Sequence, residues 1–400
     1  MFRIRHLLPI LVFLCVFSTL TLKTNADAKR YHHNVKRAGR RDCQSRSPKA
    51  RGRVLSEQPG IPSQSGKKFV GTAITLPLLS DDKVVRLVTE NFNMVTPGNV
   101  NSHSRDLIVD FCLKNGIKPR GHTAVWANQV PGWLKALDGP GLINATQNHL
   151  KQVLQHYNSK IYAFDVVNEM TGDDGKVKDT FSSQKLNSSF IQMAFQAARD
   201  TGTNAKLYIN DFGVEKKCAK SDGYFKIVKE LTEKNLINGV GMQAHLQVGQ
   251  VPSVQELKEN LQRFVALGVE VAYTELDIRM PLPATPQMLA QQAKDYRTVI
   301  TACVETEKCV GVTVWGVGYQ GQQDFLLAKF QKLKLILNCS DCVLFIQMPG
   351  SLDSWIPSFF PGTGAALLFD DDYKPTPAYD AFKEAFSGKK SVNGSNHISQ

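Results

Sequence analysis

The chain has 400 residues, 42% of them hydrophobic and 21% charged, with a formal net charge of +12. This composition indicates a packed globular core and excludes a chain that is disordered throughout. Residues 1–68 carry 15 Lys and Arg against 3 Asp and Glu, whereas the remaining residues carry 33 of each sign. A basic leader in front of a neutral domain argues against a nucleic-acid groove on the fold itself.

The first 28 residues have the order typical of a secretory signal peptide. Two arginines precede an apolar run over residues 7–20, and small residues follow at 26–28. The run is too short for a membrane span, so we expect cleavage, secretion and no membrane attachment, with an uncleaved anchor as the alternative. Residues 29–66 are basic, contain dibasic pairs and are rich in Gly, Ser and Pro, which predicts a flexible leader or propeptide.

Eight cysteines occur, one of them within the predicted signal peptide. Export permits disulfides, and Cys303 with Cys309 is the pair close enough in sequence for a bond to be expected. Cys339 and Cys342 have the spacing of half a zinc or redox motif, but no second pair stands at ligand spacing nearby, so no metal is expected. Four Asn-X-Ser/Thr sequons agree with export and glycosylation: Asn144, Asn187, Asn338 and Asn393.

From Phe69 onward, short β-rich apolar runs alternate with longer amphipathic segments. The eight candidate strands are residues 69–74, 92–96, 117–123, 161–169, 205–211, 239–245, 269–277 and 309–316. Between two of them, Ser253 and Glu256 form a capping box, and Gly268 ends that helix. Eight strands separated by helices predict an α/β fold, the (β/α)8 TIM barrel. An open doubly wound sheet is the alternative, but no Gly-rich phosphate turn follows the first strand.

Polar residues stand at or near the ends of several predicted strands. In a barrel the C-terminal strand ends meet at one mouth, so these side chains are expected to converge. They are His122, Asn168, Glu169, Asn210, Asp211, Gln243, His245, Glu275, Asp277 and Trp315. Each one alone is more often a hydrogen-bonded rim residue than a catalyst. Their combination is what indicates a functional site.

Two of these acids, Glu169 and Glu275, stand at the ends of the fourth and seventh strands. Cleavage of a glycosidic bond requires one carboxyl group that protonates the departing oxygen and one that faces the developing oxocarbenium ion. A separation of about 5–5.5 Å would make the second a nucleophile and retain the anomeric configuration. Aromatic faces pack on sugar rings, so sugar binding explains the tryptophans as well. This chemistry requires no cofactor or metal.

A series of motifs covers about residues 67–387: NFNMVTPGN, RGHTAVW with QVPGWL, FDVVNE, YINDFGVE, GVGMQAHL, YTELDIRM, CVGVTVWGV and a stretch beginning DSWIPSFFPG. In this order they resemble the fungal type of glycoside hydrolase family 10 endo-1,4-β-xylanase. FDVVNE and YTELDI are highly specific together. The resemblance implies that residues 67–387 form the catalytic barrel, followed by a tail over 388–400. It also implies a secreted monomer that hydrolyses internal links of xylan or xylo-oligosaccharides through a glycosyl-enzyme intermediate.

The resemblance implies a role for each matching position. Glu169 corresponds to the acid/base, and Glu275 to the nucleophile. His245 and Asp277 correspond to the network that orients Glu275, and Asn168 would bond the sugar 2-hydroxyl. The substrate-binding positions it implies are Asn99, His122, Trp126, Asn168, Gln243, His245, Trp315 and Trp355.

The sequence departs from the family pattern in two places. After TPGN, residues 100–105 run almost directly into the next helix, so a family segment with a sugar-binding Lys is missing. Residues 326–351 form an apolar insertion, which is unusual at a barrel mouth. Errors in the gene prediction are the favoured interpretation, with a helix that caps the cleft as the alternative for the insertion. The barrel is therefore expected either to be closed or to be incomplete around its second βα unit.

These departures leave two alternative functions open. The missing segment and the insertion would suit a catalytically impaired carbohydrate binder. A β-1,4-glucanase on the same barrel is the other alternative, because xylose and glucose differ by one hydroxymethyl group. Sugar release from xylan compared with cellulose separates all three functions.

Overall fold

The computed structural model describes residues 66–98, 102–318 and 354–387. The predicted signal peptide, nearly all of the leader, the insertion at 326–351 and the tail lie outside these residues, as do Asn99, Cys339 and Cys342. Within the described ranges, no helix is both long and apolar enough to cross a membrane.

Eight parallel strands of the described residues form the barrel. They are β1 (Phe69–Ile74), β2 (Met94–Pro97), β3 (Lys118–Gly121), β5 (Ala163–Asn168), β6 (Lys206–Asp211), β7 (Gly239–Met242), β9 (Glu270–Pro281) and β10 (Cys309–Val314). Neighbours follow the chain from β1 to β9, and β10 pairs with both β9 and β1. The predicted (β/α)8 barrel is therefore confirmed. It is also closed at its second unit, because β2 pairs with β1 and β3.

Three short strands flank the barrel strands near their C-terminal ends: β4 (Val125–Trp126), β8 (His245–Gln247) and β11 (Thr363–Gly364). β4 pairs with β5 and sets Trp126 opposite Asn168, while β8 pairs with β9 and sets His245 opposite Asp277. The sequence did not predict these strands as separate elements. The pairing of β4 and β8 brings two of the predicted site residues, Trp126 and His245, into register with barrel strands.

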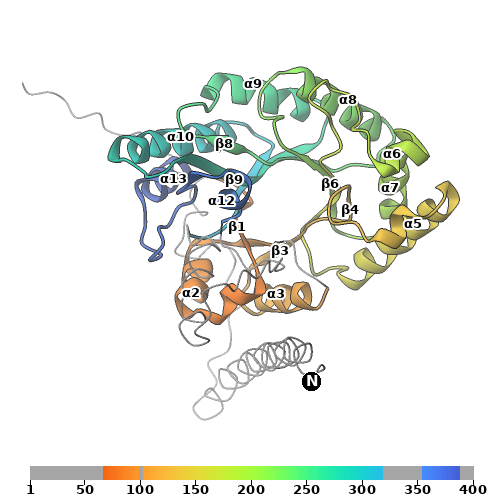
Figure 1. The fold of residues 1–400 in the computed structure, drawn as a ribbon, viewed down its shortest axis with the longest axis horizontal. Helices are drawn as coiled ribbons and strands as arrows, with labels where there is room; N and C mark the ends of the chain where they lie inside the picture. The colour runs from red at the N-terminus through yellow and green to blue at the C-terminus, as the bar shows by residue number, and fades with distance from the viewer. Residues whose placement is uncertain (1–65, 99–101, 319–353, 388–400) are drawn as a thin grey trace, which may run out of the picture. The chain divides into compact units, whose positions relative to one another are not determined.

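Helices surround the strands, as Figure 1 shows. They are α2 (Asp82–Asn91), α3 (Ser102–Lys114), α5 (Gly139–His156), α6 (Phe181–Leu186), α7 (Ser189–Asp200), α8 (Ala219–Glu233), α9 (Val254–Val265), α10 (Pro286–Val304) and α13 (Pro377–Ser387). Shorter helical turns are η3 (Leu76–Ser80), α4 (Gly132–Lys135) and α12 (Ile356–Phe359). The predicted capping box begins α9, with Ser253 and Glu256 each accepting the other's backbone N–H.

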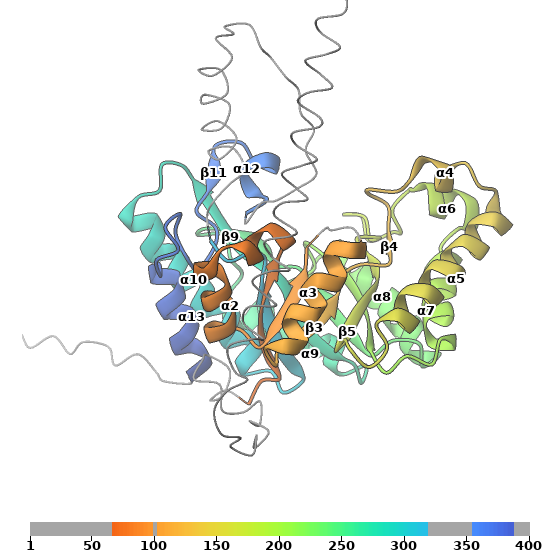
Figure 2. The ribbon, with the colours of Figure 1, turned by 90° about the horizontal axis from the view of Figure 1, so that it is seen from below.

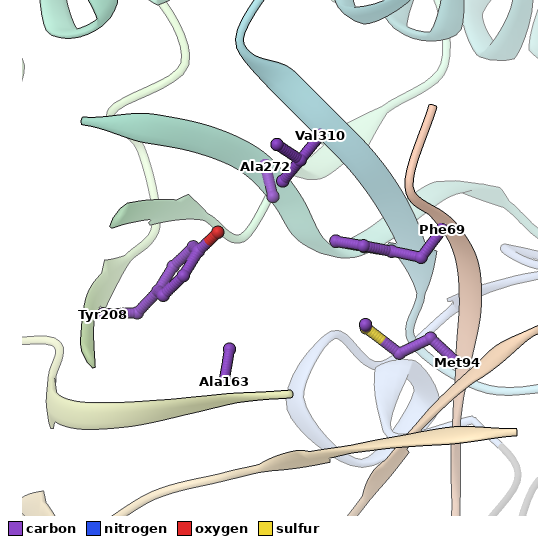
Figure 3. Close-up of a cluster of buried hydrophobic side chains, with 6 residues drawn as sticks. All are labelled: Phe69, Met94, Ala163, Tyr208, Ala272 and Val310. Carbon is purple, nitrogen blue, oxygen red and sulfur yellow. The ribbon is translucent and has the colours of Figure 1, made fainter. Parts of the chain in front are cut away.

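Side chains from six strands fill the barrel near the N-terminal ends of the strands. Figure 3 shows this cluster, which consists of Phe69, Met94, Ala163, Tyr208, Ala272 and Val310. Tyr208 occupies so much of the space that β7 needs a glycine beside it. A Cβ atom at Gly239 would lie 2.3 Å from the Tyr208 ring. Such packed interiors are typical of this fold and make the barrel a core rather than a pore.

A buried carboxylate, Glu270, lies at the same end of the barrel. Its Oε1 accepts hydrogen bonds from the hydroxyls of Tyr208 at 2.6 Å and Tyr162 at 2.8 Å, and its Oε2 accepts one from Lys68 Nζ at 2.9 Å. The Arg120 guanidinium lies 4.3 Å from the centre of the Tyr208 ring. Tyr208 therefore contacts both Glu270 and Arg120 inside the barrel.

The predicted disulfide between Cys303 and Cys309 is present, with Cα atoms 5.2 Å apart. It joins the last turn of α10 to the first residue of β10, the strand that closes the barrel. The disulfide therefore ties a surface helix to the closing strand. Among the described cysteines, Cys112 and Cys218 are free.

Replacing Glu270 with Gln should lower the free energy of unfolding by about 1–3 kcal/mol, because the charged acceptor of three donors is lost. Burial favours the neutral acid, but the hydrogen bonds from Tyr208, Lys68 and Tyr162 outweigh it and lower the pKa of Glu270. A lowered folded pKa stabilises the fold above the unfolded value of about 4.3. The difference between wild type and variant in urea unfolding should therefore shrink as the pH falls below about 4.

The matched control is Glu305→Gln, which removes an exposed ion pair with Lys258 at 2.7 Å. Exposed pairs contribute about 0–1 kcal/mol, so this variant should unfold close to wild type. Equal stability losses in the two variants would contradict the importance assigned to Glu270.

Candidate active site

The C-terminal ends of the barrel strands carry the predicted site residues to one mouth. Glu169 follows β5, Asn210 is the penultimate residue of β6, Gln243 follows β7, Glu275 and Asp277 lie in β9, and Trp315 follows β10. In Figure 2 this mouth faces upward, with α4 and α12 above the strands. In barrel enzymes this face carries the chemistry, because loops of different units meet there.

Glu275 is 4% exposed, and both of its carboxylate oxygens have donors. Oε1 accepts from Asn210 Nδ2 at 2.7 Å, and Oε2 lies 3.2 Å from His245 Nε2. His245 Nδ1 lies 2.8 Å from Asp277 Oδ2. Burial alone would lower the pKa of His245, but Asp277 and Glu275 raise it to about 10. His245 is therefore an imidazolium at neutral pH and donates to both acids.

Asn210 connects Glu275 to the neighbouring strand. Its Nδ2 donates both to Glu275 Oε1 and to Asn168 Oδ1, the latter at 2.9 Å. Its Oδ1 accepts from the Thr274 hydroxyl at 2.6 Å. A flipped amide would lose the contacts to Glu275 and Asn168, because their oxygens can only accept.

Glu169, at the opposite side of the network, is held by two donors. Trp126 Nε1 donates to its Oε2 at 2.8 Å, and Gln243 Nε2 donates to its Oε1 at 3.1 Å. Gln243 Nε2 also lies 3.3 Å from Asn168 Oδ1. One continuous hydrogen-bond network, through Gln243, Asn168 and Asn210, therefore joins the two carboxylates.

His122 lies beneath the nucleophile candidate and above the buried polar groups of the barrel. Its Nδ1 is 3.0 Å from Asp165 Oδ2 and 3.9 Å from Glu275 Oε1. Burial lowers the pKa of His122, but the hydrogen bond to Asp165 and the charge of Glu275 raise it overall. Asp165 also pairs with Arg120 at 2.5 Å, and both side chains are 1% exposed. Trp315 packs edge-to-face on the His122 ring, with centroids 5.3 Å apart.

Aromatic side chains flank both acids. Trp126 bonds Glu169, as described, and Trp355 Nε1 donates to Asp277 Oδ2 at 2.8 Å. The Trp355 ring also packs against His245, with centroids 4.7 Å apart. A cavity of about 480 Å³ opens beside Glu169, lined by Trp126, Ala127, Asn128, Lys135, Glu169, Lys178, Asp179, Thr180 and Phe181. The departing part of a substrate, whose oxygen Glu169 would protonate, has space in this cavity.

The predicted site residues that the structure describes meet at this mouth, except that the Asp211 side chain is not part of the network and instead accepts from the backbone of Thr171 and Phe212. Arg120 was missed, although a charged residue inside a predicted strand was a signal that could have found it. Asn210 was placed at the mouth but given no role, and Thr274 was not singled out. In the described part of the chain, no cluster of three or more His, Cys, Asp or Glu residues is arranged to hold a metal ion.

Comparisons with known proteins agree on one family. Residues 61–323 match the model of glycosyl hydrolase family 10. An endo-1,4-beta-xylanase of Agaricus bisporus is 39% identical over 342 residues, covering 81% of this chain and 92% of that protein. Endo-1,4-beta-xylanase A of Phanerodontia chrysosporium is 36% identical, covering 80% and 75% respectively.

Solved structures give the same result. A glycosylated endo-beta-1,4-xylanase from Gloeophyllum trabeum superposes with a TM-score of 0.70 at 35% identity, covering 82% of this chain and 99% of that one. A xylanase from Bispora, solved with xylobiose, superposes with a TM-score of 0.69 at 28% identity, covering 80% and 97%. The barrel therefore has the backbone arrangement of these enzymes over most of its length.

Replacing Asp277 with Asn should lower the pKa of His245 below its wild-type value of about 10, because one of the two carboxylates that raise it is lost while the burial and Glu275 remain. NMR titration of the His245 ring signals measures this shift. In the wild type, the charged His245 stabilises the fold fully below its unfolded pKa, and this stability is lost as the pH rises through about 10.

Asp106→Asn is the control, because Asp106 pairs with His156 on an exposed surface and does not contact His245. It should leave the His245 titration unchanged. A His245 pKa that stays near 10 in Asp277→Asn would contradict the charge pairing described for this site.

Proposed function

The chain belongs to glycosyl hydrolase family 10, and we propose that it is an endo-1,4-β-xylanase that retains the anomeric configuration. The observation that carries the proposal is the network that joins Glu169 and Glu275 at one barrel mouth. A glycosidase needs two carboxyl groups with different duties beside the same bond. Xylan is the substrate class, because the curated relatives are endo-1,4-beta-xylanases.

Glu169 acts as the acid/base in this proposal. Each of its oxygens already accepts one hydrogen bond, from Trp126 and from Gln243, so its orientation toward the cleft is fixed. The protonated carboxyl donates its proton to the departing glycosidic oxygen, whose sugar lies toward the neighbouring cavity. The resulting carboxylate then removes a proton from the water that releases the second product.

Glu275 acts as the nucleophile. In the first step one of its oxygens bonds to the anomeric carbon as the leaving sugar departs, and in the second step water breaks that bond. Asn210 and the charged His245 hold the carboxylate in place through directed hydrogen bonds. Hydrogen bonds that involve charged groups are stronger than neutral ones, so these donors limit rotation of the nucleophile.

Asn168 binds the sugar in the subsite of the nucleophile. Its Oδ1 is used by Asn210 and Gln243, whereas its Nδ2 is buried and has no partner in the structure. A buried N–H without an acceptor costs free energy, which a substrate hydroxyl would recover. The 2-hydroxyl is the acceptor that the family resemblance implies. His122, Trp315 and Trp355 would form the walls around the same sugar.

Export forms part of the same proposal. Residues 1–28 would be removed as a signal peptide and residues 29–66 as a propeptide, leaving a monomeric catalytic domain over residues 67–387. The disulfide between Cys303 and Cys309 suits an oxidising compartment. Asn144 and Asn187 are exposed, as glycosylated sequons must be.

Incubation with xylan should release xylo-oligosaccharides, while cellulose should release little sugar. NMR spectra of the first products should contain the β-anomer, because two inversions at one carbon give net retention. An α-anomer as the first product would contradict the nucleophile role. Faster release from cellulose would favour a glucanase, and binding of xylo-oligosaccharides without cleavage of either polymer would favour a carbohydrate binder.

Exchanging each acid for Ala should separate the two roles. Glu275→Ala should abolish turnover, with azide restoring cleavage of an activated aryl glycoside as the inverted glycosyl azide. Glu169→Ala should lose about 10²–10⁴-fold on xylan but much less on an aryl glycoside whose leaving group needs no proton. Full activity of Glu169→Ala on xylan would remove Glu169 from the acid/base role.

A further inference from the structure

The backbone at Glu169 has an unusual conformation. Its φ is +59°, in the left-handed region that side chains other than glycine rarely adopt. Such a residue persists where the surrounding structure holds it. Its own N–H donates to Asn210 O at 2.9 Å, and two residues later the N–H of Thr171 donates to Asp211 Oδ2, also at 2.9 Å. Asp211 therefore anchors the turn that carries Glu169.

Asp211 is buried and uses both of its oxygens. Oδ2 accepts from Thr171, Oδ1 accepts from the N–H of Phe212 at 3.0 Å, and Lys220 Nζ lies 3.4 Å from Oδ1. Lys220 is itself 3% exposed. A buried ammonium beside a buried carboxylate fixes that carboxylate in place, because leaving either charge alone would be costly.

A second left-handed residue at the mouth has the same kind of anchor. Ala244, with φ of +62°, stands between Gln243 and His245, which contact Glu169 and Glu275 respectively. Its N–H donates to Glu215 Oε1 at 2.8 Å, and Glu215 is 5% exposed. Asp211 and Glu215 both come from the end of β6 and the segment that leads to α8.

We propose that Asp211 and Glu215 are positioning residues for the two acids. Asp211 holds the left-handed turn that aims Glu169, and Glu215 holds the left-handed turn that aims Gln243 and His245. Neither side chain is expected to contact the reacting atoms. Asp211 acts by accepting the backbone N–H groups of Thr171 and Phe212, and Glu215 by accepting the N–H of Ala244. This inference rests on the proposed glycosidase function.

The test for Asp211 is the isosteric variant Asp211→Asn. An amide has one acceptor oxygen for two backbone donors, so either Thr171 or Phe212 loses its partner, and Lys220 keeps only its exposed counter-charge, Asp173. The kcat/KM for xylan should fall about ten-fold or more, because a misplaced acid protonates the leaving group poorly. The kcat/KM for 2,4-dinitrophenyl β-xylobioside should stay within about two-fold, because that group departs without protonation.

Azide provides a second readout on the same variant. A displaced Glu169 also activates water poorly, so azide, which needs no base, should accelerate turnover of the dinitrophenyl substrate.

The control for Asp211→Asn is Asp295→Asn. Asp295 is a buried acid that accepts the N–H of Gly249 at 2.7 Å, but it holds a glycine turn away from Glu169. Any loss in this control should be equal on both substrates and unaffected by azide. Equal losses of kcat/KM on xylan and on the dinitrophenyl substrate in Asp211→Asn would overturn the positioning role of Asp211.

Glu215 is tested by two variants. Glu215→Gln keeps an oxygen for the Ala244 N–H and should retain activity within about three-fold, whereas Glu215→Ala should lose about ten-fold or more on both substrates. Similar activity of the Ala and Gln variants would overturn the positioning role of Glu215.

An inactive wild type would contradict the proposed function, and the positioning roles would then be judged from crystal structures. Unchanged φ and side-chain positions of Glu169 in Asp211→Asn and of Ala244 in Glu215→Ala would contradict them.

Discussion

The pairing of β10 with both β9 and β1 is the constraint on which the rest of the structure depends. Closure turns eight separate strand ends into one ring, so side chains far apart in sequence meet above a common core. His122 after β3 and Glu275 in β9 come within 3.9 Å only because the ring is closed. The disulfide at the start of β10 secures the strand that completes it.

The interior of the barrel supports the mouth electrostatically as well as sterically. Glu270, Tyr208, Arg120, Asp165 and His122 follow one another from the lower end toward Glu275, each in contact with the next. Buried charges are tolerated only when they are paired and hydrogen-bonded. In this series each acid, Glu270, Asp165 and Glu275, lies next to at least one donor or cationic side chain. Because each group is held by the next, His122 is fixed in place beside the Glu275 carboxylate.

Much of the fold could be predicted, because periodicity records which residues are buried. The run at 69–74 coincides with β1, and Glu169 directly follows β5 as predicted, whereas Glu275 lies within the longer strand β9. Among the features that the sequence did not predict are the short strand β4, the burial of Arg120 and the left-handed backbone of Glu169. Each depends on partners distant in sequence, such as Asp165 for Arg120. Local pattern contains no information about which distant residue will supply that partner.

The Arg120–Asp165 pair also constrains how this barrel can be engineered. Both side chains are almost fully enclosed, and removing Asp165 alone would leave Arg120 as an uncompensated charge, at a cost of about 3–5 kcal/mol. Joint replacement of Arg120 and Asp165 by apolar residues of similar volume avoids that penalty, although it also removes the partner of His122 Nδ1. Directed-evolution libraries that vary one position at a time would therefore discard useful sequences here. The codons for Arg120 and Asp165 should therefore be randomised together.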